Sequence, residues 1–162
     1  MTKPLIANLS ETRIVIRKRA RTLELFDGDK KVKKCKAALG FSPIFKKAVD
    51  GDGCTPEGDF YVFTKNEKSS YFLSLGLSYP NVQDAKRGIT QHLITRDEYD
   101  EIVSAIGKKL KPPQDTRLGG EIYIHGGGTE EDWTDGCVAV ENDDMREIFD
   151  IAAVGMRVTI LP

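Results

Sequence analysis

The sequence predicts a mainly β fold with two helices, built as a β-sandwich or a partly open barrel. Short segments of alternating or β-branched residues recur along the chain, and turn residues such as glycine, proline and aspartate separate them. Only two segments have apolar residues at the three- and four-residue spacing of an amphipathic helix. A chain of 162 residues with 40% hydrophobic content suits one globular domain with an ordinary core.

Strands are expected where small or apolar residues alternate with polar ones, or form a short run between turns. In Lys31–Leu39, lysines alternate with small or apolar residues, the turn Asp27–Asp29 precedes the segment and Gly40 ends it. The expected strands are Thr12–Lys18, Thr22–Phe26, Lys31–Leu39, Asp59–Lys65, Ser70–Leu77, Glu121–His125, Cys137–Val140 and Arg157–Leu161. Strands outnumber helices, which favours a sandwich or barrel with helices at its side.

Two helices are expected. Thr95 and Glu98 form a capping box for the first, which two consecutive prolines end, and its apolar stripe is Tyr99, Ile102, Val103, Ile106 and Leu110. Asn142 is the expected N-cap of the second helix and Gly155 ends it, with a buried stripe of Met145, Ile148, Phe149 and Ala152.

No repeat, low-complexity tract or linker divides the chain. Residues 12–162 are therefore expected to form a single domain, after an N-terminal extension of residues 1–11. No apolar run reaches the roughly 18 residues of a membrane helix, so no membrane span is expected. Met1–Ser10 lacks the basic start and the continuous apolar stretch of a secretory signal. The oligomeric state is open, with a monomer favoured.

Charge is segregated along the chain, although the net charge is only −1. Residues up to Val49 hold 13 Lys/Arg against 4 Asp/Glu, whereas from Glu121 onward there are 2 against 10. This pattern fits either solvated strand faces or a basic surface that attracts an anionic polymer. Nucleic acid is not an expected partner, because Arg17–Arg21 lies in strand-like alternation without interleaved aromatic residues.

The cysteines Cys35, Cys54 and Cys137 form an odd set with no close pair. A disulfide framework is therefore not expected and at least one thiol should be free, while a bridge between Cys35 and Cys54 stays open.

The segment Ile124–Val140 (IHGGGTEEDWTDGCVAV) places His125 and Cys137 in a glycine-rich stretch with apolar residues at both ends. Three interpretations compete: a buried thiol with a structural imidazole, half of a metal site, or a nucleophile with its base. Zinc sites use closely spaced ligand pairs, and here each candidate ligand stands alone, so no metal is expected.

A buried thiol is the ordinary state of a free cysteine, and a lone histidine at a strand end is usually structural. The glycines favour catalysis instead. Gly126 and the two glycines after it leave the imidazole uncovered, and Gly136 allows a sharp turn that directs amide N–H groups towards an oxyanion at Cys137. A Cys–His pair is the minimum that thiol nucleophilic catalysis requires.

The chain resembles the L,D-transpeptidase catalytic domain family (YkuD-like, ErfK/YbiS type). The family motif is a His-Gly, followed later by Ser/Thr-x-Gly-Cys and an apolar strand; here these are His125-Gly126 and Thr134–Val138. Three further segments are similar to family segments in the same order: Gly51–Phe63 (GDGCTPEGDFYVF), Leu77–Asn81 (LSYPN) and Asn142–Ile160. The resemblance thus covers most of the chain.

The resemblance implies an L,D-transpeptidase-like fold and acyl transfer on peptidoglycan stem peptides. Cys137 would attack the carbonyl between a diamino acid and D-alanine, release D-alanine and hold the acyl group as a thioester for an amine acceptor. His125 would move the proton, the Gly126 carbonyl would orient the ring, and the amides of Gly136 and Cys137 would form the oxyanion hole. No metal or organic cofactor is implied, and carbapenems acylate members of this family.

Two positions depart from the common family pattern. Asp135 stands where a second histidine is usual, and Ala139 stands where an arginine is frequent, which leaves the acceptor and any contact with a substrate carboxylate open. The residues expected to contact the stem peptide are Tyr79, Tyr123, Trp133, Thr134 and Asp135. For the three aromatic residues a packing role is an equal alternative.

Three functions are therefore considered. The first is a Cys137-dependent L,D-transpeptidase or, second in line, a carboxypeptidase or amidase acting on the same stem peptides. The others are a non-catalytic cell-wall-binding module and a nucleic-acid binder. The resemblance implies the cell envelope or periplasm, reached after removal of a signal before Met1 or by another route, such as that of a secreted effector.

Overall fold

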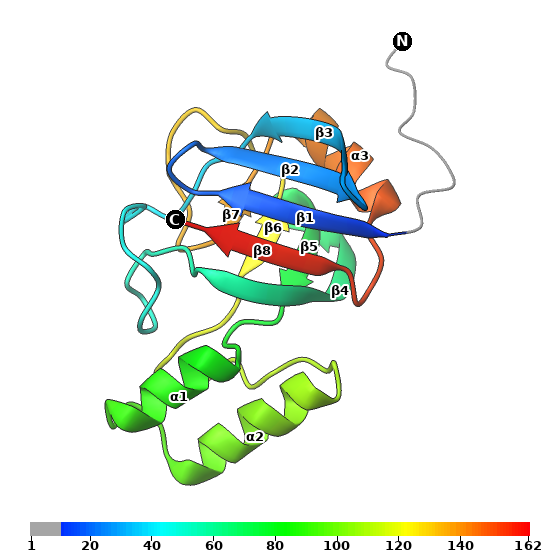
Figure 1. Ribbon diagram of the computed structural model, residues 1–162. Coiled ribbons are helices and arrows are strands. Elements are labelled where there is room, and N and C mark those ends of the chain that lie inside the picture. The colour runs from blue at the N-terminus through cyan, green and yellow to red at the C-terminus, as the bar shows by residue number, and fades with distance from the viewer. Residues whose placement is uncertain (1–10) are drawn as a thin grey trace.

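The computed structural model describes residues 11–162, so the predicted extension of residues 1–11 lies outside it except for Glu11. Eight strands form one sheet in the order β3-β2-β1-β8-β4-β5-β6-β7 (Figure 1). The strands are β1 Thr12–Arg17, β2 Thr22–Asp27, β3 Lys30–Lys36, β4 Gly58–Ser69, β5 Phe72–Leu77, β6 Tyr123–His125, β7 Val138–Ala139 and β8 Arg157–Leu161. The predicted mainly β fold is confirmed, and every expected strand is present; β8 has the expected ends, and the ends of the other strands are shifted.

The sheet curls into a partly open barrel. Its central strand β8 pairs in parallel with β1 on one side and antiparallel with β4 on the other. Past the end of β3, Ala38 forms an antiparallel bridge with Ala139 of β7, which brings the two edges of the sheet together. Alternate apolar side chains of most strands point to the inner face, for example Ile14 and Ile16 of β1, as a period-two pattern requires.

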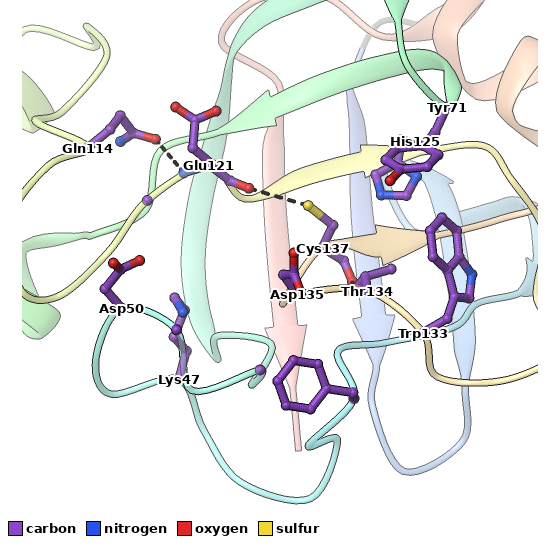
Figure 2. A pocket seen from close by; sticks show the side chains of 14 residues that line it. Lys47, Asp50, Tyr71, Gln114, Glu121, His125, Trp133, Thr134, Asp135 and Cys137 are labelled. Atoms are coloured by element: carbon purple, nitrogen blue, oxygen red, sulfur yellow. Dashed lines mark hydrogen bonds between the residues drawn. The ribbon is translucent and has the colours of Figure 1, made fainter.

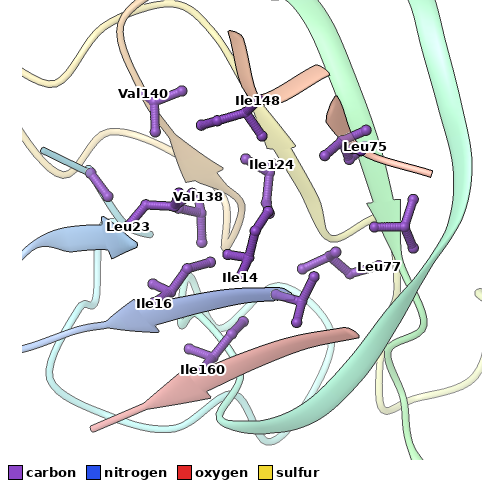
Figure 3. Packing of buried hydrophobic residues seen from close by; sticks show 14 of the residues in the cluster. Ile14, Ile16, Leu23, Leu75, Leu77, Ile124, Val138, Val140, Ile148 and Ile160 are labelled. Atoms are coloured by element: carbon purple, nitrogen blue, oxygen red, sulfur yellow. The ribbon is translucent and has the colours of Figure 1, made fainter. Parts of the chain in front are cut away.

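The hydrophobic core fills the interior of this curled sheet. Side chains from both halves of the chain meet there, among them Ile14, Ile16, Leu75, Ile124, Val138, Ile148 and Ile160 (Figure 3). Helix α3, Asn142–Ile151, packs into the same core through Met145, Ile148 and Phe149. The strands that carry His125 and lead from Cys137 are therefore anchored in the main core.

Helices α1, Val82–Thr90, and α2, Arg96–Gly107, form a pair beside the β4 side of the barrel (Figure 1). Ala85, Ile94, Ile102 and Leu118 make a separate small core for them. The sequence predicted only two helices, so α1 is an addition to the expected fold. Its capping box, Asn81 with Asp84, is present in the sequence, but α1 is short and its apolar face consists of only Val82, Ala85 and Ile89.

The ends of the two predicted helices also differ from expectation. Helix α2 stops at Gly107, and Leu110, placed in its apolar stripe, lies beyond the helix and is 56% exposed. The N-cap of α3 is Glu141 rather than Asn142. The Asn142 side chain is used elsewhere, because it accepts a hydrogen bond from the Gly127 amide at 3.0 Å.

All three cysteines are free thiols, so the Cys35–Cys54 bridge left open by the sequence is absent. Between residues 11 and 162 no helix has the length and apolar character needed to cross a membrane. The same residues contain no cluster of three or more His, Cys, Asp or Glu side chains suited to a metal ion.

Candidate active site

A pocket of about 530 Å³ lies where the loop after β3, the segment before β6 and the turn before β7 converge (Figure 2). His125 and Cys137 both line it, together with Phe41, Lys47, Asp50, Gly51, Gly53, Tyr71, Gln114, Gly120, Glu121, Trp133, Thr134 and Asp135. The parallel pairing of β6 with β7 sets Ile124 opposite Val138 and His125 opposite Ala139. This register brings the candidate base and nucleophile, which are separated in sequence, into one pocket.

The His125 imidazole is almost fully buried and is held on three sides. Its Nδ1 lies 2.6 Å from the carbonyl oxygen of Gly126, so Nδ1 carries the proton and Nε2 is left as the acceptor. Tyr71 stacks on the ring at a centroid distance of 4.8 Å, and Trp133 meets it edge-on at 5.5 Å. Burial lowers the pKa of His125, although the hydrogen bond with Gly126 opposes part of that change.

The Cys137 thiol lies just before β7 and is partly exposed to the pocket. Its Sγ donates to the carbonyl oxygen of Glu121 at 3.3 Å and accepts from the Tyr123 amide at 3.4 Å. Burial raises the pKa of the thiol to about 11, while the Tyr123 amide acts in the opposite direction. The thiol and the imidazole are thus both uncharged at neutral pH.

The sulfur is directed at Glu121 rather than at His125. In Figure 2 the Cys137 side chain points to the Glu121 carbonyl, and the His125 ring lies between Tyr71 and Trp133 further along the sheet. Among residues 11–162 the thiol has no hydrogen bond with the imidazole; its partners are the two backbone groups. The thiol and the imidazole therefore line one pocket without a direct hydrogen bond between them.

The turn before Cys137 is braced by Thr134. Its hydroxyl donates to the Cys137 carbonyl at 2.7 Å and accepts from the Gly136 amide at 3.1 Å. Gly136 has φ +140°, and a Cβ there would lie 2.8 Å from the Cys54 carbonyl oxygen, so only glycine fits. The Gly136 amide, expected to face an oxyanion, is occupied by Thr134 in this state.

The segment that carries Trp133 and Thr134 is fixed to the N-terminal strands. Asp132 accepts two hydrogen bonds at 3.1 Å from Arg21 Nε and one at 2.9 Å from Arg21 Nη2. The same carboxylate accepts from the Leu39 amide at 2.9 Å. These bonds tie one wall of the pocket to residues distant in sequence.

The predicted substrate-contact residues are placed differently. Trp133, Thr134 and Asp135 line the pocket. Tyr123 is not among the lining side chains; its amide contacts the sulfur and its phenol donates to Glu121 Oε2 at 3.0 Å. Tyr79 is wrongly assigned, because it is fully buried and its hydroxyl donates to the Leu118 carbonyl at 2.6 Å. The packing alternative therefore holds for Tyr79.

Several lining residues were missing from the sequence prediction, chiefly Tyr71, Gln114 and Glu121. Tyr71 comes from the β4–β5 hairpin and Gln114 from the segment after α2, both far from the Cys–His motif. Nothing in their local sequence indicates which strand their loops would reach. Glu121 was placed at the start of a strand, whereas it precedes β6 with a positive φ of 56°.

Comparison with known proteins identifies one family. The sequence profile of the L,D-transpeptidase catalytic domain (YkuD) matches residues 11–160. No curated protein matches the chain.

Three solved structures have a similar fold. The helical cell shape determining protein Pgp2 (K307A mutant) from Campylobacter jejuni is 20% identical, with a TM-score of 0.66 over 96% of this chain and 48% of that one. Bd1075 from Bdellovibrio bacteriovorus is 19% identical, with a TM-score of 0.61 over 98% and 50%. An L,D-transpeptidase from Mycobacterium smegmatis is 12% identical, with a TM-score of 0.56 over 94% and 59%. The chain thus spans about half the length of Pgp2 and Bd1075.

Proposed function

The chain belongs to the L,D-transpeptidase catalytic domain family, and we propose that it is a cysteine-dependent L,D-transpeptidase acting on peptidoglycan stem peptides. The observation that carries the proposal is the common pocket of Cys137 and His125, in which Gly126 holds Nδ1 and leaves Nε2 as the base. This is the arrangement of nucleophile, base and orienting group that acyl transfer needs.

In the first half-reaction, the Cys137 side chain turns from Glu121 and its proton passes to Nε2 of His125 as Sγ attacks the carbonyl between the diamino acid and D-alanine. The amides of Cys137 and Gly136 donate hydrogen bonds to the tetrahedral oxyanion. To do so, the Gly136 amide gives up its hydrogen bond to the Thr134 hydroxyl. When the intermediate collapses, the amine of D-alanine takes the proton from the imidazolium, and the acyl group remains on Sγ as a thioester.

In the second half-reaction an amine acceptor attacks the thioester. His125 accepts the proton of the amine and returns it to the leaving thiolate, so that the enzyme is regenerated. Because both groups are uncharged at rest, His125 acts as a general base during the attack rather than as half of a preformed thiolate–imidazolium pair.

The side chains around the thiol suit an amine acceptor. Asp50, Glu121 and Asp135 are exposed and line the pocket, and its one lysine, Lys47, is buried with its Nζ 3.1 Å from Asp52. A cationic amine is attracted to such a wall more strongly than neutral water is, and it releases one proton to solvent before it attacks the thioester. Transpeptidation is therefore proposed ahead of hydrolysis of the same bond.

Substrates of this class place the protein's action at the cell wall, in the envelope or periplasm. We propose that the described domain alone holds the catalytic residues, and that no metal or organic cofactor takes part.

The test is incubation with purified tetrapeptide muropeptides and analysis of the products by mass spectrometry. Joined dimers with loss of D-alanine are expected for the wild-type protein and none for Cys137→Ser. Loss of D-alanine without joining would identify a carboxypeptidase instead. No reaction from a folded protein with a reduced Cys137 would favour a wall-binding module.

A further inference from the structure

Glu121 has an unusual backbone conformation directly beside the sulfur. Its φ is +56°, a left-handed value that side-chain-bearing residues rarely adopt and that needs support from neighbouring groups. This conformation directs the Glu121 carbonyl at Cys137, where it accepts the thiol hydrogen at 3.3 Å. The resting position of the nucleophile thus depends on what holds Glu121.

Gln114 holds Glu121. Its Oε1 accepts from the Glu121 amide at 2.8 Å, and its Nε2 donates to the Tyr79 carbonyl at 2.8 Å and the Pro112 carbonyl at 2.9 Å. Because Tyr79 is fully buried, the Gln114 side chain connects Glu121 to the interior of the protein. A Cβ at Gly120 would lie 2.8 Å from Gln114, so the glycine leaves room for the connection.

We propose that Gln114 is a positioning residue for the nucleophile: by fixing the Glu121 backbone, it keeps the Cys137 thiol hydrogen-bonded to the Glu121 carbonyl and turned from His125 until substrate binds. The inference rests on the proposed function only in taking Cys137 as the nucleophile.

The two backbone groups at the sulfur have opposite effects. The Glu121 carbonyl accepts a hydrogen that only the neutral thiol carries, whereas the Tyr123 amide favours the thiolate. The charged groups that act on the thiol are the carboxylates of Asp135 and Glu121, which disfavour ionisation, and the ammonium of Lys47, which favours it. His125 faces the same pocket as a neutral imidazole. Release of the carbonyl should therefore make the thiol easier to ionise.

The experiment compares Gln114→Met, which keeps the side-chain length without its hydrogen bonds, with the wild-type protein. The rate of Cys137 alkylation by iodoacetamide is measured against pH and mapped by peptide mass spectrometry. We expect the midpoint of the pH profile of Cys137 alkylation to be about one pH unit lower in Gln114→Met. At pH 8 this corresponds to an alkylation rate about tenfold higher than that of the wild-type protein. Stem-peptide turnover should rise by up to about tenfold, because the thiol no longer has to leave the Glu121 carbonyl before it turns to His125.

A joint rise in the alkylation of Cys137 and in turnover distinguishes positioning from general damage, which would lower turnover. Gln83→Met is the matched control, since Gln83 is exposed on α1, and it should leave the alkylation profile of Cys137 unchanged. An unchanged profile in Gln114→Met, or faster alkylation of Cys35 and Cys54 as well, would contradict the proposal.

A second measurement needs no folded Gln114 variant. In the wild-type protein, the infrared S–H stretching band that disappears in Cys137→Ala should have the lowered frequency of a hydrogen-bonded thiol. A band at the frequency of a free thiol would overturn the inference. If either result contradicts the role of Gln114 while the wild-type protein still turns over stem peptides, the proposed transpeptidase function stands. If both results are as expected but the wild-type protein has no turnover, the role of Gln114 stands and the proposed function does not.

Discussion

At the scale of single residues, the proposed chemistry depends on Cys137 and His125, and both rest in the uncharged form. Burial disfavours the thiolate and the imidazolium alike, so the proton should move only as the substrate carbonyl is attacked. Selective alkylation of Cys137 at neutral pH, the behaviour of a preformed ion pair, is therefore not expected from the resting geometry. Three predictions concern these two residues.

Replacement of Cys137 by alanine should abolish turnover and leave the fold intact, since the side chain lies at the edge of the pocket and not in the core. Cys35→Ala is the paired control: Cys35 lies in β3, outside the pocket, and its loss should leave turnover unchanged. Muropeptide turnover, with circular dichroism as the check on folding, decides the matter. Turnover that survives in Cys137→Ala would eliminate the thioester mechanism.

The pH dependence of acylation should follow His125. Only the neutral imidazole can accept the thiol proton, and burial lowers the pKa of His125 from the usual value of 6.5. The rate should therefore rise with pH through a midpoint below about 6.5 and be level near pH 7. Stopped-flow measurement of acylation over pH 4.5 to 9 would test this. A rate that climbs only above about pH 8 would mean that the thiol ionises without His125.

A carbapenem should acylate Cys137, because its strained lactam carbonyl can take the place of the scissile carbonyl. Intact-protein mass spectrometry should detect one added carbapenem, and His125→Ala should slow its formation by about 10² to 10⁴. Asp135 is exposed in the pocket and should repel the anionic probe, so added salt should speed capture in the wild-type protein. No adduct at low or high salt, with a reduced thiol, would count against the nucleophile.

At the scale of elements, the sequence predicted what depends on local pattern. Period-two alternation located the eight strands, and the Thr95–Glu98 capping box located the start of α2. The errors occurred where the deciding contact is distant in sequence. Tyr79 is buried and its hydroxyl donates to the Leu118 carbonyl, and the Asn142 side chain accepts a hydrogen bond from the Gly127 amide instead of capping α3. Such choices depend on which loop lies opposite, and a local pattern contains no information about that.

The Asp132–Arg21 contact should stabilise the pocket wall measurably. Asp132→Ala removes three hydrogen bonds with Arg21 and leaves the Leu39 amide without its partner, which should lower the free energy of unfolding by about 1–3 kcal/mol. Acylation should also slow, because Trp133 loses its anchor. Urea unfolding measures the first effect. Arg96→Ala, which breaks an exposed pair with Asp100, should change stability by less than about 1 kcal/mol. If both variants lost the same free energy of unfolding, the Asp132–Arg21 contact would not be what stabilises the pocket wall.

At the scale of the whole molecule, the sequence indicated a curled sheet with helices at its side but not the order of the strands. Alternation shows that a segment is a strand without showing its neighbours. The position of β8 between β1 and β4 follows from long-range pairing alone. That His125 and Cys137 line one pocket was predictable because β6 and β7 are close in sequence, whereas Tyr71, Gln114 and Glu121 reach the pocket through the three-dimensional fold.

Because β8 lies in the middle of the sheet, truncation of one of its buried side chains should destabilise the whole fold. Ile160 is 1% exposed in the core, and Ile160→Ala should lower the free energy of unfolding by about 2–5 kcal/mol. Val154→Ala removes apolar atoms from a side chain that is 62% exposed and should cost less than about 0.5 kcal/mol. Denaturant unfolding of both variants gives the comparison. A loss below about 1 kcal/mol for Ile160→Ala would mean that the core does not depend on β8.

The position of β8 also bears on how the protein is made. A ribosome synthesises β1 to β7 first, as two groups of strands whose facing edges, β1 and β4, have no strand between them. Such open edges can pair with those of other nascent chains. The sheet joins only when Arg157–Leu161 leaves the exit tunnel and pairs with both edges. We therefore expect the unfinished chain to depend on chaperones, and a translational pause shortly before residue 157 to increase aggregation.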